Sequence, residues 1–211
     1  MMIEIKHKGS GAVLFKVDAA TLAGANLTSA QLRGANLSGQ DLSHAILKNC
    51  DLREADLRNA NLQEAEVKDA CLSTAALNNA NLTKVDLANS QLVGADLSGA
   101  CLRQAHLRYT KLSGANLSAA DLTGADLSMA DGRANFTDAN LTRANLRCMD
   151  LSGANFMGAN LTEANLHGAN VTCAKWARAK MQNTIDASGN RTSNAPNNLK
   201  RPNKPWWQFW A

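Results

Sequence analysis

Aromatic residues make up only 4% of this 211-residue sequence, although 45% of its residues are hydrophobic. The apolar content is therefore mostly Ala and Leu. Phe, Tyr and Trp normally dominate the burial of apolar surface in protein cores. The composition thus argues against the thick, aromatic-rich core that is typical of an enzyme.

Long apolar runs and an ordered cysteine pattern are also missing. No stretch approaches the roughly 18 consecutive apolar residues that a membrane-spanning helix needs. The first nine residues, MMIEIKHKG, lack the apolar core of a secretory signal. Five scattered cysteines are an odd number, which argues for reduced thiols rather than a disulfide framework. We therefore expect a cytoplasmic protein.

The sequence does contain a repeat of five residues. Leu recurs at every fifth position from Leu22 to Leu127, with Val67 as the only substitution. The register slips by one residue near 128–134, and the period then resumes at Phe136 and continues to Met181. A small residue, usually Ala, stands two positions before each of these central residues, and Asp or Asn often stands directly before. Such internal periodicity is the signature of a solenoid.

The period excludes the two simplest alternatives. On an α-helix a five-residue step turns about 500°, so the Leu residues would spiral around every face. A long strand alternates its side chains with period two, and five is odd. A short extended piece followed by a corner does fit, and ten of the 14 glycines stand two positions after a central residue, where a tight corner is expected.

Runs such as GANLSGQDL, EADLRNANL and GANFMGANL resemble the pentapeptide-repeat family, whose motif is A(D/N)Lxx. This resemblance implies an all-β fold, a right-handed quadrilateral parallel β-helix with four pentapeptides in each coil. The interior would be lined by stacked Ala and central residues. Representative core residues are Leu27, Leu37, Leu57, Leu97, Leu117, Phe136, Phe156 and Trp176.

The sequence divides into three parts. Residues 1–16 predict a β-hairpin that caps the first coil, because apolar and polar residues alternate on both sides of Gly9-Ser10-Gly11. Residues 17–182 are the repeat region. Residues 183–211 predict a flexible linker and a Trp-rich tail, since the period stops after Met181 and all three prolines lie here.

Several inward positions depart from Ala. Gln40, Ser90 and Thr110 are polar and should bond to neighbouring backbone groups. Val85 and Met149 are larger than the position normally holds.

No constellation of catalytic or metal-binding residues is present. The four histidines fall in different coils, and none has metal-motif spacing to a cysteine or to another histidine. No phosphate loop, nucleophile elbow or carboxylate pair occurs. We expect no catalysis, no metal and no cofactor.

Two segments are candidates for binding a protein. The first is the basic cluster in LRQAHLRYTKL, which contains the only tyrosine. The second is the aromatic tail, which could fold back or dimerise, bind a partner, or touch a membrane interface. The candidate residues are Arg103, His106, Arg108, Tyr109 and Lys111 in the cluster, and Trp206, Trp207, Phe209 and Trp210 in the tail.

The leading hypothesis is a non-catalytic rod that binds an unknown protein partner, with homodimerisation left open. One branch of the family supplies an alternative, a DNA mimic that binds topoisomerase (gyrase) and protects it from quinolones. Mimicry requires a strongly acidic rod, whereas residues 17–182 carry 15 basic and 16 acidic residues. A third hypothesis is a structural rod anchored to a membrane by its tail alone. Binding to nucleic acid is not expected, because the basic excess is small.

Overall fold

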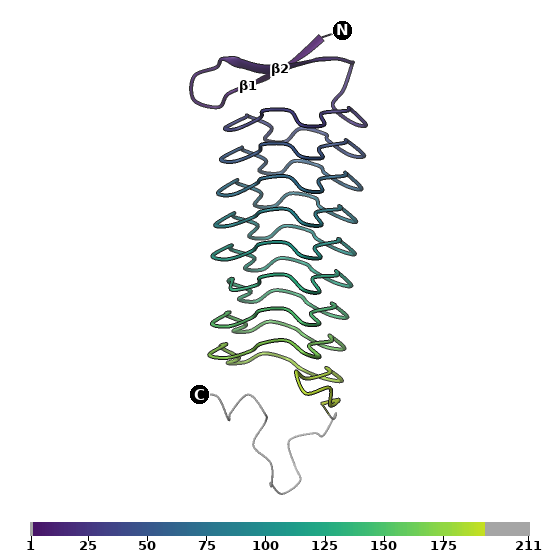
Figure 1. The fold of residues 1–211 in the computed structure, drawn as a ribbon, viewed down its shortest axis with the longest axis vertical. Helices are drawn as coiled ribbons and strands as arrows, with labels where there is room; N and C mark the ends of the chain where they lie inside the picture. The colour runs from purple at the N-terminus through teal and green to yellow at the C-terminus, as the bar shows by residue number, and fades with distance from the viewer. Residues whose placement is uncertain (1, 193–211) are drawn as a thin grey trace, which may run out of the picture.

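The computed structural model describes residues 2–192, which form a stack of similar coils with a hairpin across one end (Figure 1). The hairpin consists of β1 (Met2–Lys6) and β2 (Val13–Asp18), paired antiparallel with Ile3 opposite Val17. The two strands are the only extended elements longer than an isolated bridge among the described residues. All further pairing is between single residues of successive coils.

Each coil advances by twenty residues. Parallel bridges join Asn61 to Asp41 before it and to Asn81 after it, and the same spacing recurs along the repeat region. The amide of Leu42 donates to the carbonyl of Asn61 at 2.7 Å, and the amide of Asn61 donates to the carbonyl of Gln40 at 2.9 Å. Four five-residue units therefore make one coil, and the units of successive coils fall into four rows. Each row is a narrow parallel ladder with the usual interstrand spacing of about 4.8 Å.

The interior is formed by the central residues and by the small residues that precede them by two positions. All eight representative core residues are buried, and Trp176 is the most exposed of them at 8%. One row ends in an aromatic stack, with ring centroids 4.9 Å apart for Phe136–Phe156 and 4.5 Å apart for Phe156–Trp176. Buried Ser90 and Thr110 donate to the carbonyls of Val67 and Leu107, at 2.6 and 2.7 Å.

The Asp or Asn that precedes a central residue makes hydrogen bonds of two kinds. Its side-chain oxygen accepts the amide of the residue two positions later, as Asn81 does from Thr83 at 3.2 Å, which fixes the start of the corner. Asn also donates its amide to the same position of the preceding coil, as Asn81 does to Asn61 at 2.9 Å. Asp can only accept, so Asn above Asp makes a satisfied pair.

The corners require positive φ two positions after the central residue. Glycine supplies it at Gly24, where φ is 68°, but many units use another residue, and Asn is common. Two corners carry large apolar side chains, Tyr109 at 61° and Met129 at 62°, and they lie in adjacent coils.

The register slip is a shortened corner. The bridge partner of Asn116 is Asn135, nineteen residues away rather than twenty. Gly132 stands where a central Leu is expected, and the amide of Ala134 donates to its carbonyl at 2.7 Å. The donor is thus two residues after the central position, whereas it is three residues after it in most other corners. The Met149 side chain of the next coil fills the space that a side chain on Gly132 would need. Met149 therefore compensates for the missing Leu rather than overfilling its position.

The hairpin is bonded to the first coil. The amide of Lys8 donates to the carbonyl of Gly34, and the amide of Asn36 donates to the carbonyl of Lys6, both at 2.8 Å. Ile5 is 2% exposed and joins the core, so the hairpin closes this end of the interior.

Two sequence expectations are wrong. Gln40 is exposed rather than inward, because its row begins at Ala20, which is itself exposed where the chain enters from β2. Residues 183–192 are not a linker, since the amide of Leu166 bonds to the carbonyl of Ile185 at 2.8 Å and Ile185 pairs antiparallel with Arg191. The five-residue period is difficult to recognise here because Thr184 and Ile185 replace the usual Ala and Asn. The rest of the predicted linker and the aromatic tail, 193–211, lie outside the described residues.

Candidate functional site: a groove across three coils

The predicted basic cluster does not form one surface. Arg103, His106 and Lys111 belong to three different rows, all exposed, because the chain turns a corner after every five residues. Only Arg108 and Tyr109 contact each other directly, with the guanidinium carbon 5.6 Å from the ring centroid. Arg103 instead lies 3.9 Å from Asp121 of the next coil. The candidate residues of the tail, Trp206, Trp207, Phe209 and Trp210, lie outside the described part of the chain.

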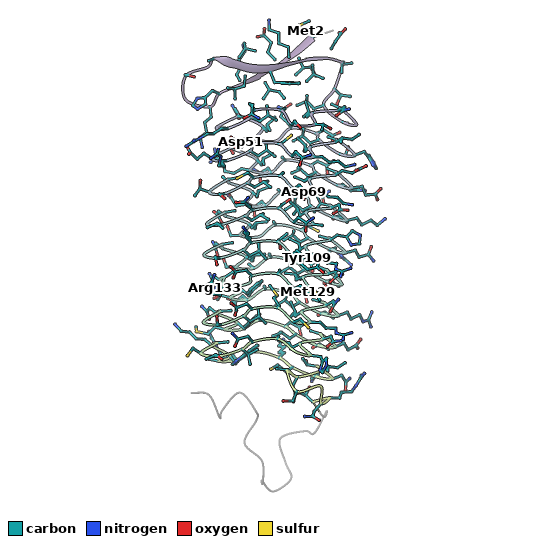
Figure 2. All side chains as sticks on the ribbon, in the orientation of Figure 1. Met2, Asp51, Asp69, Tyr109, Met129 and Arg133 are labelled. Atoms are coloured by element: carbon teal, nitrogen blue, oxygen red, sulfur yellow. The ribbon has the colours of Figure 1, made fainter. Side chains whose placement is uncertain are left out.

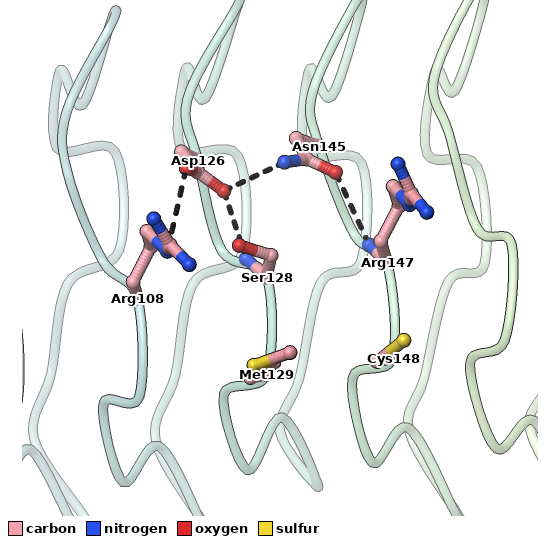
Figure 3. Close-up of a pocket in the computed structure, with 7 residues that line it drawn as sticks. All are labelled: Arg108, Asp126, Ser128, Met129, Asn145, Arg147 and Cys148. Carbon is pink, nitrogen blue, oxygen red and sulfur yellow. Dashed lines mark hydrogen bonds and ion pairs between the residues drawn. The ribbon is translucent and has the colours of Figure 1, made fainter.

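A groove of about 300 Å³ crosses three coils beside Arg108 (Figure 3). It lies in the row that contains Leu107, Leu127 and Leu146. We call it the row groove, and its lining residues are Arg108, Asp126, Ser128, Met129, Asn145, Arg147 and Cys148.

The groove exists because one small residue stands between two large ones. Arg108, Ser128 and Arg147 occupy the same position in three successive coils, directly after the central Leu. Ser128 is buried, while both arginines are exposed. The two guanidinium groups thus line the ends of a depression whose floor is a serine.

The two arginines differ in their electrostatic partners. In this row a cation reaches the carboxylate that precedes the central residue of the next coil, as in Lys48–Glu66 at 2.6 Å and Lys68–Asp86 at 2.9 Å. Arg108 follows this rule loosely, with Asp126 at 3.9 Å. The corresponding residue for Arg147 is the neutral Asn165, and its guanidinium has no ion-pair partner anywhere in residues 2–192.

The single carboxylate of the groove is already satisfied. Asp126 Oδ1 accepts the amide of Ser128 at 3.0 Å and the side-chain amide of Asn145 at 2.9 Å. The net charge of the lining is therefore positive, and the available hydrogen-bond donors outnumber the acceptors. An anionic group such as a carboxylate fits this arrangement best.

Apolar surface borders the groove. Tyr109 and Met129 are 50% and 48% exposed, and they lie along the same edge of the stack (Figure 2). Both hold positive φ, a conformation that is costly for a bulky side chain and is favoured by Gly or Asn. The other described non-Gly corners with positive φ carry Ala, Cys or a polar or charged side chain, so these two are the large apolar side chains at such corners.

The described residues can be examined for metal ligands and for a reactive thiol. No group of three or more His, Cys, Asp or Glu within 2–192 could hold a metal ion. Burial raises the pKa of the Cys50 thiol to about 11, so this inward cysteine remains protonated at neutral pH. No helix in this part of the chain is long and apolar enough to cross a bilayer.

Sequence reasoning found Arg108 and Tyr109 but missed Ser128, Met129 and Arg147. Residues that are close together in the sequence are divided among rows here, whereas neighbours between coils are twenty residues apart, or nineteen across the slip. A search at that spacing would have aligned the three.

Family models match most of the repeat region. A pentapeptide repeat region model matches residues 20–97, and a pentapeptide repeats model matches residues 100–131 and 134–184 in eight copies. The chain belongs to the pentapeptide repeat family. The break in the second match at 132–133 coincides with the shortened corner of this pentapeptide repeat protein.

Solved structures of the same family are similar to the chain. HetL, involved in heterocyst differentiation regulation in the cyanobacterium Nostoc, is 33% identical, with 80% of this chain and 88% of HetL covered and a TM-score of 0.38. A protein of the Arabidopsis thaliana thylakoid lumen is 30% identical, with 50% and 70% covered and a TM-score of 0.35. QnrB1, a plasmid-mediated fluoroquinolone resistance protein, is 16% identical, with 81% and 87% covered and a TM-score of 0.40. A search of curated proteins gives no match.

Proposed function

We propose that this pentapeptide repeat protein is a non-catalytic rod that binds an acidic segment of a partner protein at the row groove. The observation that carries the proposal is the guanidinium of Arg147, which has no ion-pair partner in residues 2–192, beside the exposed Met129 in a groove that Tyr109 borders. Arginine and tyrosine are enriched among the residues that dominate protein interfaces. The proposal includes the right-handed, four-sided form of the coil that the family resemblance implies.

The surface charge favours this function over DNA mimicry. Cations and carboxylates alternate between neighbouring coils, for example in Arg33–Glu54 at 2.5 Å and Arg143–Glu163 at 2.7 Å. A duplex mimic would instead present rows of carboxylates without such cations. The groove therefore suits a partner segment that brings its own negative charge and one apolar side chain.

The test is affinity capture from a lysate of the source organism with three full-length baits. These are the natural protein, a Met129→Ser, Arg147→Gln variant, and an Arg143→Gln variant as the matched control. Arg143 lies four residues from Arg147, in the neighbouring row, and its loss removes the same charge outside the groove.

We expect one protein to be retained by the natural and control baits and lost by the groove variant. Equal retention by all three baits would place recognition elsewhere on the molecule. A partner whose captured segment is basic would contradict the charge argument. Both variants replace exposed residues, so circular dichroism should show unchanged folding.

A further inference from the structure

The last coil, residues 169–188, differs from the others in its cations. Lys175, Arg178 and Lys180 are exposed, and none has an ion-pair partner among residues 2–192. In the coil before, the aligned residues are Asn155, Gly158 and Asn160, which are all neutral, so no carboxylate stands at the aligned positions. This end of the stack therefore carries uncompensated positive charge.

Backbone polarity adds to this charge. In the preceding coil the amides of Leu161 and Glu163 donate to the carbonyls of Lys180 and Gln182, both at 2.8 Å. The equivalent amides of the last coil, such as those of Met181 and Asn183, point the same way and have no backbone acceptor within residues 2–192. The amides without such an acceptor are those of Val171, Cys173, Arg178, Met181 and Asn183, whereas the matching free carbonyls are fewer, those of Ala169, Ala174 and Ala179.

Apolar side chains occupy the centre of the same end. Val171, Ala174 and Ala179 are only partly buried against the core, and within residues 2–192 no hairpin like that of β1 and β2 covers this coil (Figure 1). The surface is thus an apolar centre within a rim of cations and amide donors. The sequence that follows contains Lys200, Arg201 and Lys204 and then the aromatic tail.

We propose that the last coil docks on an anionic lipid bilayer. Lipid phosphates would accept hydrogen bonds from the three cations and from the free amides, while the apolar centre contacts the headgroup boundary. The apolar centre favours a bilayer over nucleic acid, whose backbone offers phosphates without an apolar boundary. The rod would then stand on the membrane with the row groove free.

The test is co-sedimentation of the full chain with vesicles of phosphatidylcholine, alone or mixed with phosphatidylglycerol. We expect binding only to the mixed vesicles, and its loss at about 0.5 M salt, where the screening length falls below about 5 Å. A Lys175→Gln, Arg178→Gln, Lys180→Gln variant should lower the partition coefficient by about a hundredfold, since each cation near an anionic surface contributes about fivefold.

The matched control removes three cations elsewhere, as Arg33→Gln, Lys48→Gln, Lys84→Gln. It should change the partition coefficient by less than about fivefold. Equal losses in the two variants would overturn the proposal, because binding would then follow net charge alone. Tighter binding to duplex DNA than to the mixed vesicles at the same salt would also overturn it.

A variant with all four tail aromatics replaced by Ser separates the tail from the coil. Its binding should weaken but still depend on Lys175, Arg178 and Lys180. Full binding by the three-Gln variant, with none by the tail variant, would assign docking to the tail and refute the role of the coil. Arg147→Gln should leave vesicle binding unchanged, so failure here is distinct from failure of the proposed groove function.

Discussion

Replacing Asn116 by Asp would test whether the side-chain hydrogen bonds between the Asp and Asn residues of successive coils hold the coils in register. Asn116 Nδ2 donates to Asp96 Oδ1 at 3.1 Å, and Asn116 Oδ1 accepts from Ser118 and from Asn135, at 3.2 and 3.0 Å. The substitution Asn116→Asp keeps the shape and both accepted bonds. It removes the donor and places a second carboxylate against Asp96.

The expected loss of stability follows from that distance. Two unit charges 3.1 Å apart repel by about 1 kcal/mol in water and by about 5 kcal/mol at the effective dielectric constant of a protein surface. Both positions are half-buried, so the true value lies between these limits. The lost hydrogen bond adds about 1 kcal/mol. We therefore expect a destabilisation of about 2 to 4 kcal/mol at pH 7.

The assay is denaturant unfolding of the variant and the natural protein at pH 7 and at pH 3. The repulsion raises the folded-state pKa of the introduced carboxyl above its unfolded value of about 4. The penalty is therefore absent below that unfolded value and grows as the pH rises through the folded one. We expect the difference between the two proteins to shrink markedly at pH 3, where the protonated carboxyl can donate to Asp96.

Asn155→Asp is the matched control in the same row. Asn155 donates to Thr137 rather than to a carboxylate, at 2.9 Å, and Lys175 is its bridge partner in the next coil. Its replacement should cost less than about 1 kcal/mol, the worth of one hydrogen bond. An equal loss of stability in both variants would refute the role of the hydrogen bond between Asn116 and Asp96. A loss for Asn116→Asp that is the same at both pH values would refute it too.

Two further predictions concern the slip. Met149→Ala should cost about 2 to 5 kcal/mol, measured by denaturant unfolding, because it opens a cavity against Gly132; no loss would mean that the shortened corner needs no filling. The guanidinium of Arg133 lowers the pKa of Asp131 to about 2, so the stability from this pair is present above about pH 4 and is lost as the pH falls toward 2. Asp131→Asn should therefore lower the unfolding midpoint at pH 6 and have little effect at pH 2, and an effect that does not depend on pH would contradict the pairing.

The sequence predicts the solenoid well because the same five-residue period determines which side chains are buried and where the backbone turns. A central Leu every fifth residue with Ala two before it can be buried along the whole chain only if each unit is one short extended piece of a coil. The side-chain hydrogen bonds that Asp and Asn make between coils cannot be predicted from the period in the same way. Asn81 bonds to a residue twenty positions earlier, and that distance is known only once the number of units per coil is fixed.

The remaining errors arise where a residue depends on the next coil. Met149 is large for its own position, but its side chain fills the space beside Gly132 of the preceding coil, and Gln40 is exposed because no complete coil lies above its row. The basic cluster around Arg103 was contiguous in sequence but is divided by corners. The local sequence pattern predicts the structure of one five-residue unit. The contacts between coils can be predicted only when the number of residues per coil is known.

The same regularity makes exceptions informative. Most other corners with positive φ carry Gly or a polar side chain, whereas Tyr109 and Met129 place large apolar side chains there, 50% and 48% exposed, where they bury little for the fold. An arginine at position 147 gains no ion pair, although cations elsewhere in its row do. Three departures from the local rule meet at one groove, and folding explains none of them. The contact with a partner that we propose would account for all three, which is why we choose the groove rather than the longest run of charged residues as the candidate site.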